Sequence, residues 1–242
     1  MSLTLLFACM ATVFLGGLVQ GLFGYGLGLL LLPVLAVLSP GSLPQVILLL
    51  GLPTVAWMAF HERHDINFSS VRWLVVGRVA GTLLGLVALG ALAEPFLQVT
   101  FGVVTALMVV GTMVGSRLIA VNSRTSLVAG GFSGLMSTIA GVGGPPIAML
   151  YSRRTGPELR STLSVVLFLG AVMSLVGVVV IGRVRLSDLG LATACLPALA
   201  LGILASRTLL RRVSVPVFRL LLLAVSLVSG LLVIALVLTG SS

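Results

Sequence analysis

The chain alternates between apolar runs and short polar gaps, and ten such runs can be traced. Several of them reach the roughly 20 residues that a transmembrane helix needs to cross a bilayer. They do not alternate polar and apolar residues, as the strands of an outer-membrane barrel do. The pattern therefore predicts an all-α polytopic membrane protein with helices over residues 3–20, 27–38, 46–60, 71–92, 96–114, 126–139, 145–151, 159–181, 189–204 and 216–238.

The composition narrows the class of protein further. Of the 242 residues, 59% are hydrophobic and 8% are charged, whereas soluble domains carry about 25% charged residues. This balance excludes a soluble globule and also a disordered chain, which needs high charge and low hydrophobicity. Residues 1–242 are accordingly predicted to form a single membrane domain within a lipid bilayer. The 14 basic residues are all Arg and lie mostly between the runs, as in cytoplasmic loops, so nucleic acid is not expected as a partner.

Two of the runs are too short to cross a bilayer and follow glycine-rich breaks. Residues 27–38 would span about 18 Å as a helix, against a hydrocarbon core of about 30 Å. The first break reads GLFGYGLG over residues 21–28, and the second reads GVGGPP over residues 141–146. Such breaks survive within a membrane where protein buries them or where they line a polar cavity. We therefore expect both breaks to lie at a functional site.

The two breaks align at an offset of 117 residues. At this offset Gly17, Leu18, Gly24 and Gly26 each fall on an identical residue in the second half, and Gly85 falls on Gly202. The order of the runs agrees with the same offset. We therefore predict two structural repeats, residues 1–117 and 118–242.

The Arg residues distinguish two topologies for these repeats. If each broken element crosses the membrane once, the Arg residues of the gaps divide six to six between the two sides. If each broken element is a re-entrant-like hairpin that returns to its starting side, three transmembrane helices remain per repeat and the repeats are inverted. Ten Arg residues then lie on one side of the membrane and only Arg183 and Arg185 on the other, which obeys the positive-inside rule. The ten are Arg63, Arg72, Arg117, Arg124, Arg153, Arg154, Arg160, Arg207, Arg211 and Arg212. We therefore expect inverted repeats with both termini outside the cytoplasm.

Inverted repeats with broken helices near the midplane are a recurring plan of transporters. In that plan the backbone N–H groups at the breaks suit an anion, and uncharged side chains beside them offer further donors. Those side chains have a second interpretation, in which they satisfy backbone groups freed by the break. The aromatic residues at the first break either gate the site or pack the hairpin tip. The candidate binding residues are Gln20, Phe23, Gly24, Tyr25, Gly26, Ser137, Thr138, Gly141, Gly143, Gly144 and Pro145.

Arg78 lies about seven residues inside the fourth run. An intramembrane Arg is costly and marks a functional site by default, so Arg78 is a further candidate for pairing with an anion. The alternative is that its side chain extends along the helix to the cytoplasmic surface. Gly77, Gly81 and Gly85, on the same helix face, predict close packing against another helix of this chain or of a second copy.

The other titratable groups give weaker indications of function. His61 and His64 lie in a polar gap with Glu62 and Asp65, where a histidine could couple transport to protons or simply be solvated. Cys9 and Cys195 sit within apolar runs and are interpreted as small buried hydrophobic residues. No metal-ligand spacing is present, so no metal, cofactor or catalytic residue is predicted.

At residues 17–26 and 141–146 the chain resembles the sulfite exporter TauE/SafE family of bacterial inner-membrane proteins. The resemblance in length and segment order covers nearly the whole chain. It implies a secondary transporter that exports small sulfur-containing anions, such as sulfite or organosulfonates including sulfoacetate. In an inner membrane, the orientation predicted from the Arg residues would place both termini in the periplasm. A passive anion channel and a non-transporting membrane assembly partner are the alternatives. A homodimer is left open, and enzymatic activity is not expected.

Overall fold

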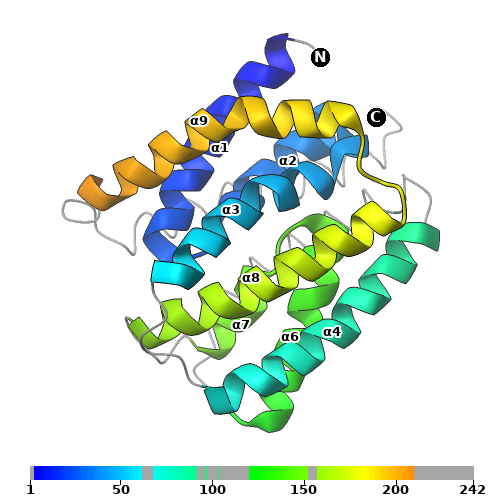
Figure 1. Ribbon diagram of the computed structural model, residues 1–242, viewed down its shortest axis with the longest axis vertical. Coiled ribbons are helices and arrows are strands. Elements are labelled where there is room, and N and C mark those ends of the chain that lie inside the picture. Colours follow the sequence, from blue (N-terminus) through cyan, green and yellow to red (C-terminus); the bar gives the residue numbers. More distant parts are fainter. Residues whose placement is uncertain are drawn as a thin grey trace.

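The computed structural model describes residues 3–61, 68–91, 120–151 and 157–209, together with Phe96 and Val103. Every element assigned in these residues is a helix, as Figure 1 shows. The all-α prediction is therefore confirmed. The helices are α1 (Leu3–Phe23), α2 (Leu27–Leu38), the 3-10 turn η1 (Pro40–Ser42), α3 (Gln45–His61), α4 (Phe68–Ala91), α6 (Ser123–Ala140), α7 (Gly144–Leu150), α8 (Pro157–Val180) and α9 (Leu186–Leu209).

Eight of the ten predicted runs coincide with these helices to within a few residues. The runs at 96–114 and 216–238 lie outside the described residues, apart from Phe96 and Val103. The observed ends have local causes. Asn122 accepts the N–H of Thr125 at 2.9 Å and so caps α6, while Gly141 ends α6 in the left-handed conformation that favours glycine.

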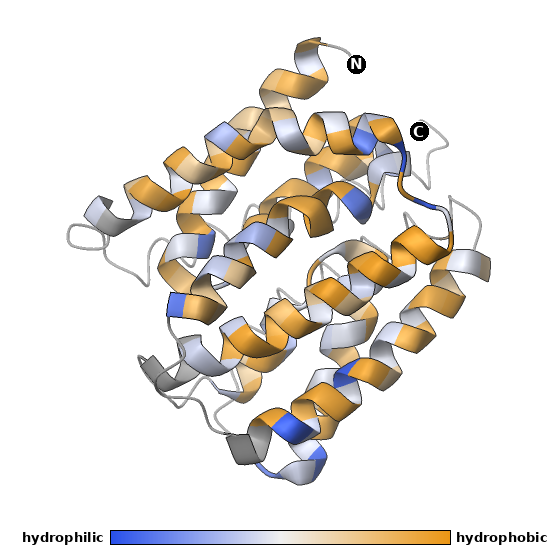
Figure 2. Ribbon diagram, viewed as in Figure 1, coloured by the Kyte–Doolittle hydropathy of each residue, from blue (hydrophilic) through white to orange (hydrophobic). Residues whose placement is uncertain are grey.

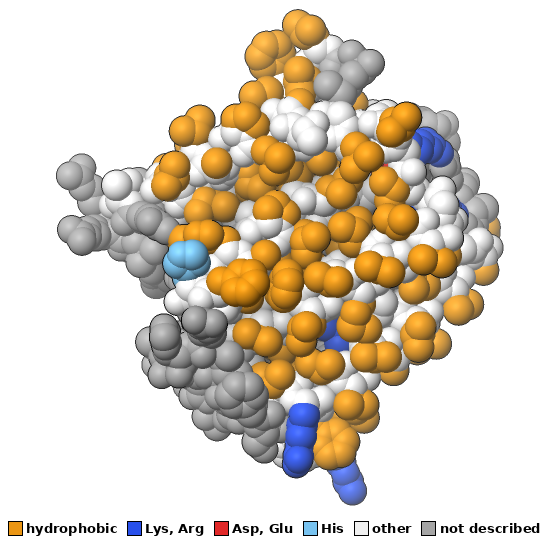
Figure 3. Space-filling model, viewed as in Figure 1, with side chains coloured by type: hydrophobic (Ala, Val, Ile, Leu, Met, Phe, Trp, Pro, Cys, Tyr) orange, Lys and Arg blue, Asp and Glu red, His pale blue; other side chains and the backbone are white. Residues whose placement is uncertain are grey.

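The described helices form a multi-pass membrane protein. Five of them are long and apolar enough to cross a bilayer: Leu3–Phe23, Pro40–His61, Val71–Ala91, Ser161–Val180 and Leu186–Ser206. Apolar residues predominate along the described helices, as Figure 2 shows, and apolar side chains are spread over the face seen in Figure 3. Val87, for example, is 69% exposed. A surface of this kind is suited to lipid, which can cover apolar side chains but cannot hydrogen-bond to the backbone.

Glycines hold α4 and α6 in close contact. A Cβ atom added at Gly77 would overlap the Leu127 carbonyl oxygen, and one added at Gly81 would overlap that of Gly131. From the other side, Gly134 lies against the Arg78 carbonyl oxygen. The packing role predicted for the α4 glycines is therefore confirmed, and the partner is a helix of the same chain. A similar contact joins α1 and α9, where a Cβ atom at Gly17 would lie 2.8 Å from the Leu199 carbonyl oxygen.

The packing also relates the two halves of the chain. The short helices α2 and α7 begin at Leu27 and Gly144, and 144 − 27 gives the offset of 117. Helix α1 packs on α9, and α6 packs on α4, so the first helix of each half contacts the fourth helix of the other half. Helices α3 and α8 run side by side between these pairs, as Figure 1 shows. This arrangement is the one expected of a duplicated unit, and the division at residue 117 stays a prediction.

Candidate functional site

Both predicted breaks are present as interruptions between helices. In the first, Gly24 has a φ of 84° and Gly26 a φ of 133°, in a region that L side chains rarely adopt. In the second, Gly141 has a φ of 73° and Gly143 immediately precedes α7. The glycines therefore let the chain change direction between a long helix and a short one.

The two breaks pack against each other. A Cβ atom added at Gly28 would lie 2.7 Å from Val142 Cγ2 and 3.1 Å from the Gly141 carbonyl oxygen. A Cβ atom added at Gly144 would lie 2.5 Å from Tyr25 Cβ. The two breaks are therefore in direct contact, although they lie more than 100 positions apart in the sequence.

A cavity of about 60 Å³ lies where the breaks meet. A bound water molecule needs roughly 10–15 Å³ by the same measure, so the cavity has room for about four to six non-hydrogen atoms. Helices α3, α4 and α8 complete its wall through residues such as Ile47, Leu167 and Ala171. Nine of the twelve predicted site residues line it: Gln20, Tyr25, Gly26, Arg78, Ser137, Gly141, Gly143, Gly144 and Pro145.

The other three predicted residues do not line the cavity. The Gly24 N–H donates to the Gln20 carbonyl oxygen at 2.8 Å and is therefore already used. The Thr138 hydroxyl bonds the Gly134 carbonyl oxygen at 3.0 Å and Ser174 Oγ at 2.9 Å. Phe23 ends α1 with a half-buried side chain. These positions were suggested by their adjacency to the breaks along the chain, and adjacency alone did not place them on the cavity wall.

Gln20 bridges the first break. Its Oε1 accepts the N–H of Leu27, the first residue of α2, at 3.2 Å, and its Nε2 lies 3.5 Å from the Gly24 carbonyl oxygen. The structure therefore supports the interpretation that Gln20 satisfies backbone groups freed by the break. The Gln20 side chain also lines the cavity. The hydrogen bonds that it makes across the break therefore fix this part of the cavity wall in position.

Arg78 is the charged residue on the cavity wall, within the part of the chain that the structure describes. Its side chain is 1% exposed, so it does not extend to the membrane surface, and the snorkelling alternative is wrong. Its Nη1 donates to Ser133 Oγ, and Ser133 Oγ donates in turn to the Gly143 carbonyl oxygen at 2.5 Å. A single hydroxyl thus connects the buried cation to the second break.

Two glycines make room for the guanidinium group. A Cβ atom added at Gly170 of α8 would overlap Nε of Arg78, and one added at Gly143 would lie 2.9 Å from its Nη2. Sequence reasoning missed Ser133 and Gly170. Ser133 lies four residues before Ser137, on the same face of α6, and that spacing could have revealed it. Gly170 lies within an apolar run, and no neighbouring residue in the sequence marks it as part of a site.

The charge of Arg78 has no acidic partner among the described residues. Asp188 is the acidic residue whose side chain is described, and it accepts the Arg185 N–H at 2.9 Å, at the start of α9. Arg78 Nε is buried, and the described residues offer it no hydrogen-bond partner. Burying an unpaired ion costs several kcal/mol. The described part of the cavity wall therefore holds a buried positive charge without a described counter-charge.

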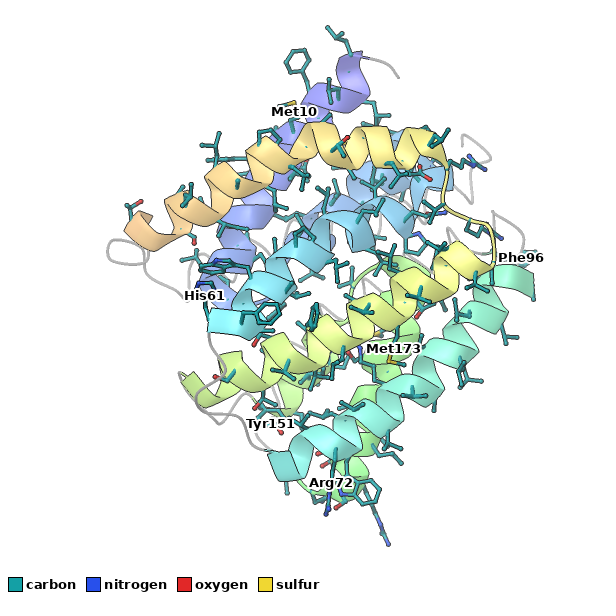
Figure 4. The ribbon with its side chains drawn as sticks, viewed as in Figure 1. Met10, His61, Arg72, Phe96, Tyr151 and Met173 are labelled. Atoms are coloured by element: carbon teal, nitrogen blue, oxygen red, sulfur yellow. The ribbon has the colours of Figure 1, made fainter. Side chains whose placement is uncertain are left out.

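The other sequence candidates that the structure describes are not among the residues that line this cavity. His61 is exposed at the end of α3 (Figure 4). Its ring stacks on that of Trp57, with 4.4 Å between the ring centroids. Glu62, His64 and Asp65 lie outside the described residues. Cys9 and Cys195 are buried and free, as predicted. The described residues contain no group of three or more His, Cys, Asp or Glu side chains that could hold a metal ion.

A model of the sulfite exporter TauE/SafE family matches residues 9–233, which is nearly the whole chain. No curated protein and no solved structure gives a significant match.

Proposed function

Because the chain belongs to the sulfite exporter TauE/SafE family of membrane transporters, we propose that it exports small sulfur-containing anions across the bacterial inner membrane. Sulfite and organosulfonates such as sulfoacetate are the proposed substrates. Transport moves these anions without chemical conversion, so the protein acts as a carrier and not as an enzyme.

The observation that carries this proposal is the position of Arg78. A fully buried guanidinium group lines a small cavity and lacks an acidic partner among the described residues. A bound anion would supply the missing negative charge, and Arg is well suited to oxyanions because its N–H groups form a rigid, planar fork. The cavity of about 60 Å³ is of a size for sulfite, which has four non-hydrogen atoms.

The proposed mechanism is alternating access by two inverted repeats around this cavity. Each repeat contributes one break, and each repeat places its first helix against the other repeat. A rocking motion of one repeat against the other would expose the cavity first to one side of the membrane and then to the other. Both termini lie in the periplasm in this proposal, because that orientation places ten Arg residues of the gaps in the cytoplasm. Proton coupling and a homodimer stay predictions.

Proteoliposomes test the proposal directly. Vesicles loaded with sulfite, and others loaded with a sulfonate, should release the anion at a rate that saturates with its concentration and depends on the protein. A passive channel would instead release the anion without saturation and without exchange against external anion. An assembly partner would give no more release than anion-loaded liposomes without protein, and this result would contradict the proposal.

A further inference from the structure

The described wall of the cavity carries one formal charge, that of Arg78. Its other polar side chains are those of Gln20, Tyr25 and Ser137, which are all uncharged at neutral pH. The rest of the described wall is glycine, proline and apolar side chains. The described wall therefore presents a net charge of +1 to a ligand in the cavity.

The hydrogen bonds around Arg78 fix this charge in place. The hydroxyl of Ser133 accepts from the guanidinium and uses its own proton on the Gly143 carbonyl oxygen, so it has no second proton to give a ligand. Arg78 stays protonated because guanidinium is not deprotonated in proteins. Nε of the same group has no partner among the described residues. The recognition of charge at this site therefore falls to the guanidinium itself.

We propose that this site selects its substrate by net charge and takes small monoanions with a sulfur–oxygen head group in preference to dianions. The inference rests on the proposed function, since it concerns the substrate of the same cavity. A monoanion such as hydrogensulfite or methanesulfonate leaves the occupied cavity neutral. A dianion leaves a buried charge of −1, and a neutral ligand leaves a buried charge of +1, and both are disfavoured where water is largely excluded. Sulfoacetate, with a sulfonate and a carboxylate, is then a poorer substrate than hydrogensulfite.

Three probes of similar shape separate charge from size. Dimethyl sulfone is neutral, methanesulfonate is a monoanion and sulfate is a dianion, and each is a tetrahedral sulfur compound with five non-hydrogen atoms. Binding to the purified full-length protein in detergent is measured by titration calorimetry. We expect methanesulfonate to bind at least about tenfold more tightly than either of the others. Sulfate binding as tightly as methanesulfonate would overturn the inference, and so would the failure of all three to bind.

Replacing Arg78 provides a second test of charge selection. Because a hydrogen bond to a charged group contributes about 1.5–3 kcal/mol, Arg78→Gln should weaken methanesulfonate binding roughly 10- to 100-fold. Dimethyl sulfone should then bind at least as well as methanesulfonate. The matched control is Arg72→Gln on the same helix, because Arg72 is exposed and points away from the helices, as Figure 4 shows. If Arg78→Gln keeps the wild-type order of affinities, charge selection by Arg78 is wrong.

Transport measured in parallel separates this inference from the proposed function. If sulfite leaves proteoliposomes but sulfate binds as tightly as methanesulfonate, the protein is a transporter and charge selection is wrong. If the three probes bind in the expected order but no sulfur anion crosses the membrane, the charge-selective site stands and the transport function is wrong.

Discussion

Gly170 of α8 lies directly against the guanidinium group of Arg78 on α4, with no space between them for a methyl group. The buried position of the cation therefore depends on a residue of a different helix, 92 positions later in the sequence (170 − 78). Ser133 of α6 holds the same group from another direction. Residues of three helices, α4, α6 and α8, thus fix the buried position of Arg78.

Replacing Gly170 by Ala should displace the guanidinium group, because the new Cβ atom would overlap Nε. We expect sulfite efflux from proteoliposomes to fall at least about tenfold, while the variant still inserts into membranes. Gly177→Ala is the matched control on the same helix, since its Cβ atom would meet the flexible side chain of Leu86 instead. Equal efflux by both variants would show that the position of Arg78 is unimportant for transport.

Replacing Ser133 by Ala should remove the link between Arg78 and the Gly143 carbonyl oxygen. A buried acceptor left without its donor costs about 1–3 kcal/mol, so we expect a lower unfolding temperature in detergent and weaker binding of methanesulfonate. Ser126→Ala, on the same helix, is the control. Ser126 is buried too, but its hydroxyl has no hydrogen-bond partner among the described residues. The account would be in error if the two variants behaved alike.

Replacing Gly81 by Val should separate α4 from α6, because even its Cβ atom would overlap the Gly131 carbonyl oxygen. We expect little folded protein in size-exclusion chromatography after extraction in detergent. Gly90→Val tests the same change on the same helix at a position where a Cβ atom would meet nothing within 4 Å. A normal elution profile for Gly81→Val would argue against close packing of these helices.

The inverted topology predicts the sides of two loops. In a background with Cys9 and Cys195 replaced by Ala, single cysteines at Arg63 and Arg153 should both be labelled by an impermeant maleimide from the cytoplasmic side. The reason is that both positions belong to the set of ten Arg residues predicted to face the cytoplasm. Labelling of the two cysteines from opposite sides would instead support repeats that run parallel.

Most of the helices could be predicted from the sequence because their apolar runs are long, and the breaks could be predicted because glycine is dense there. Arg78 was recognisable since a charge within an apolar run is rare. Thr138 could not be placed from the sequence, because each residue turns about 100° around a helix; its hydroxyl bonds Ser174 Oγ, and Thr138 is not among the residues that line the cavity. Ser133 could have been found from its four-residue spacing to Ser137, whereas Gly170 acquires its role through packing against a side chain of another helix, which no local pattern of residues reveals.

The central claim is that Arg78 provides the positive charge that binds the transported anion. The most direct test compares sulfite efflux from proteoliposomes containing the wild-type protein, Arg78→Gln, Arg78→Lys or Arg72→Gln, with equal amounts of folded protein. The account predicts that Arg78→Gln abolishes saturable efflux, that Arg78→Lys retains part of it because the charge remains, and that Arg72→Gln matches the wild type. Wild-type efflux by Arg78→Gln would contradict the claim.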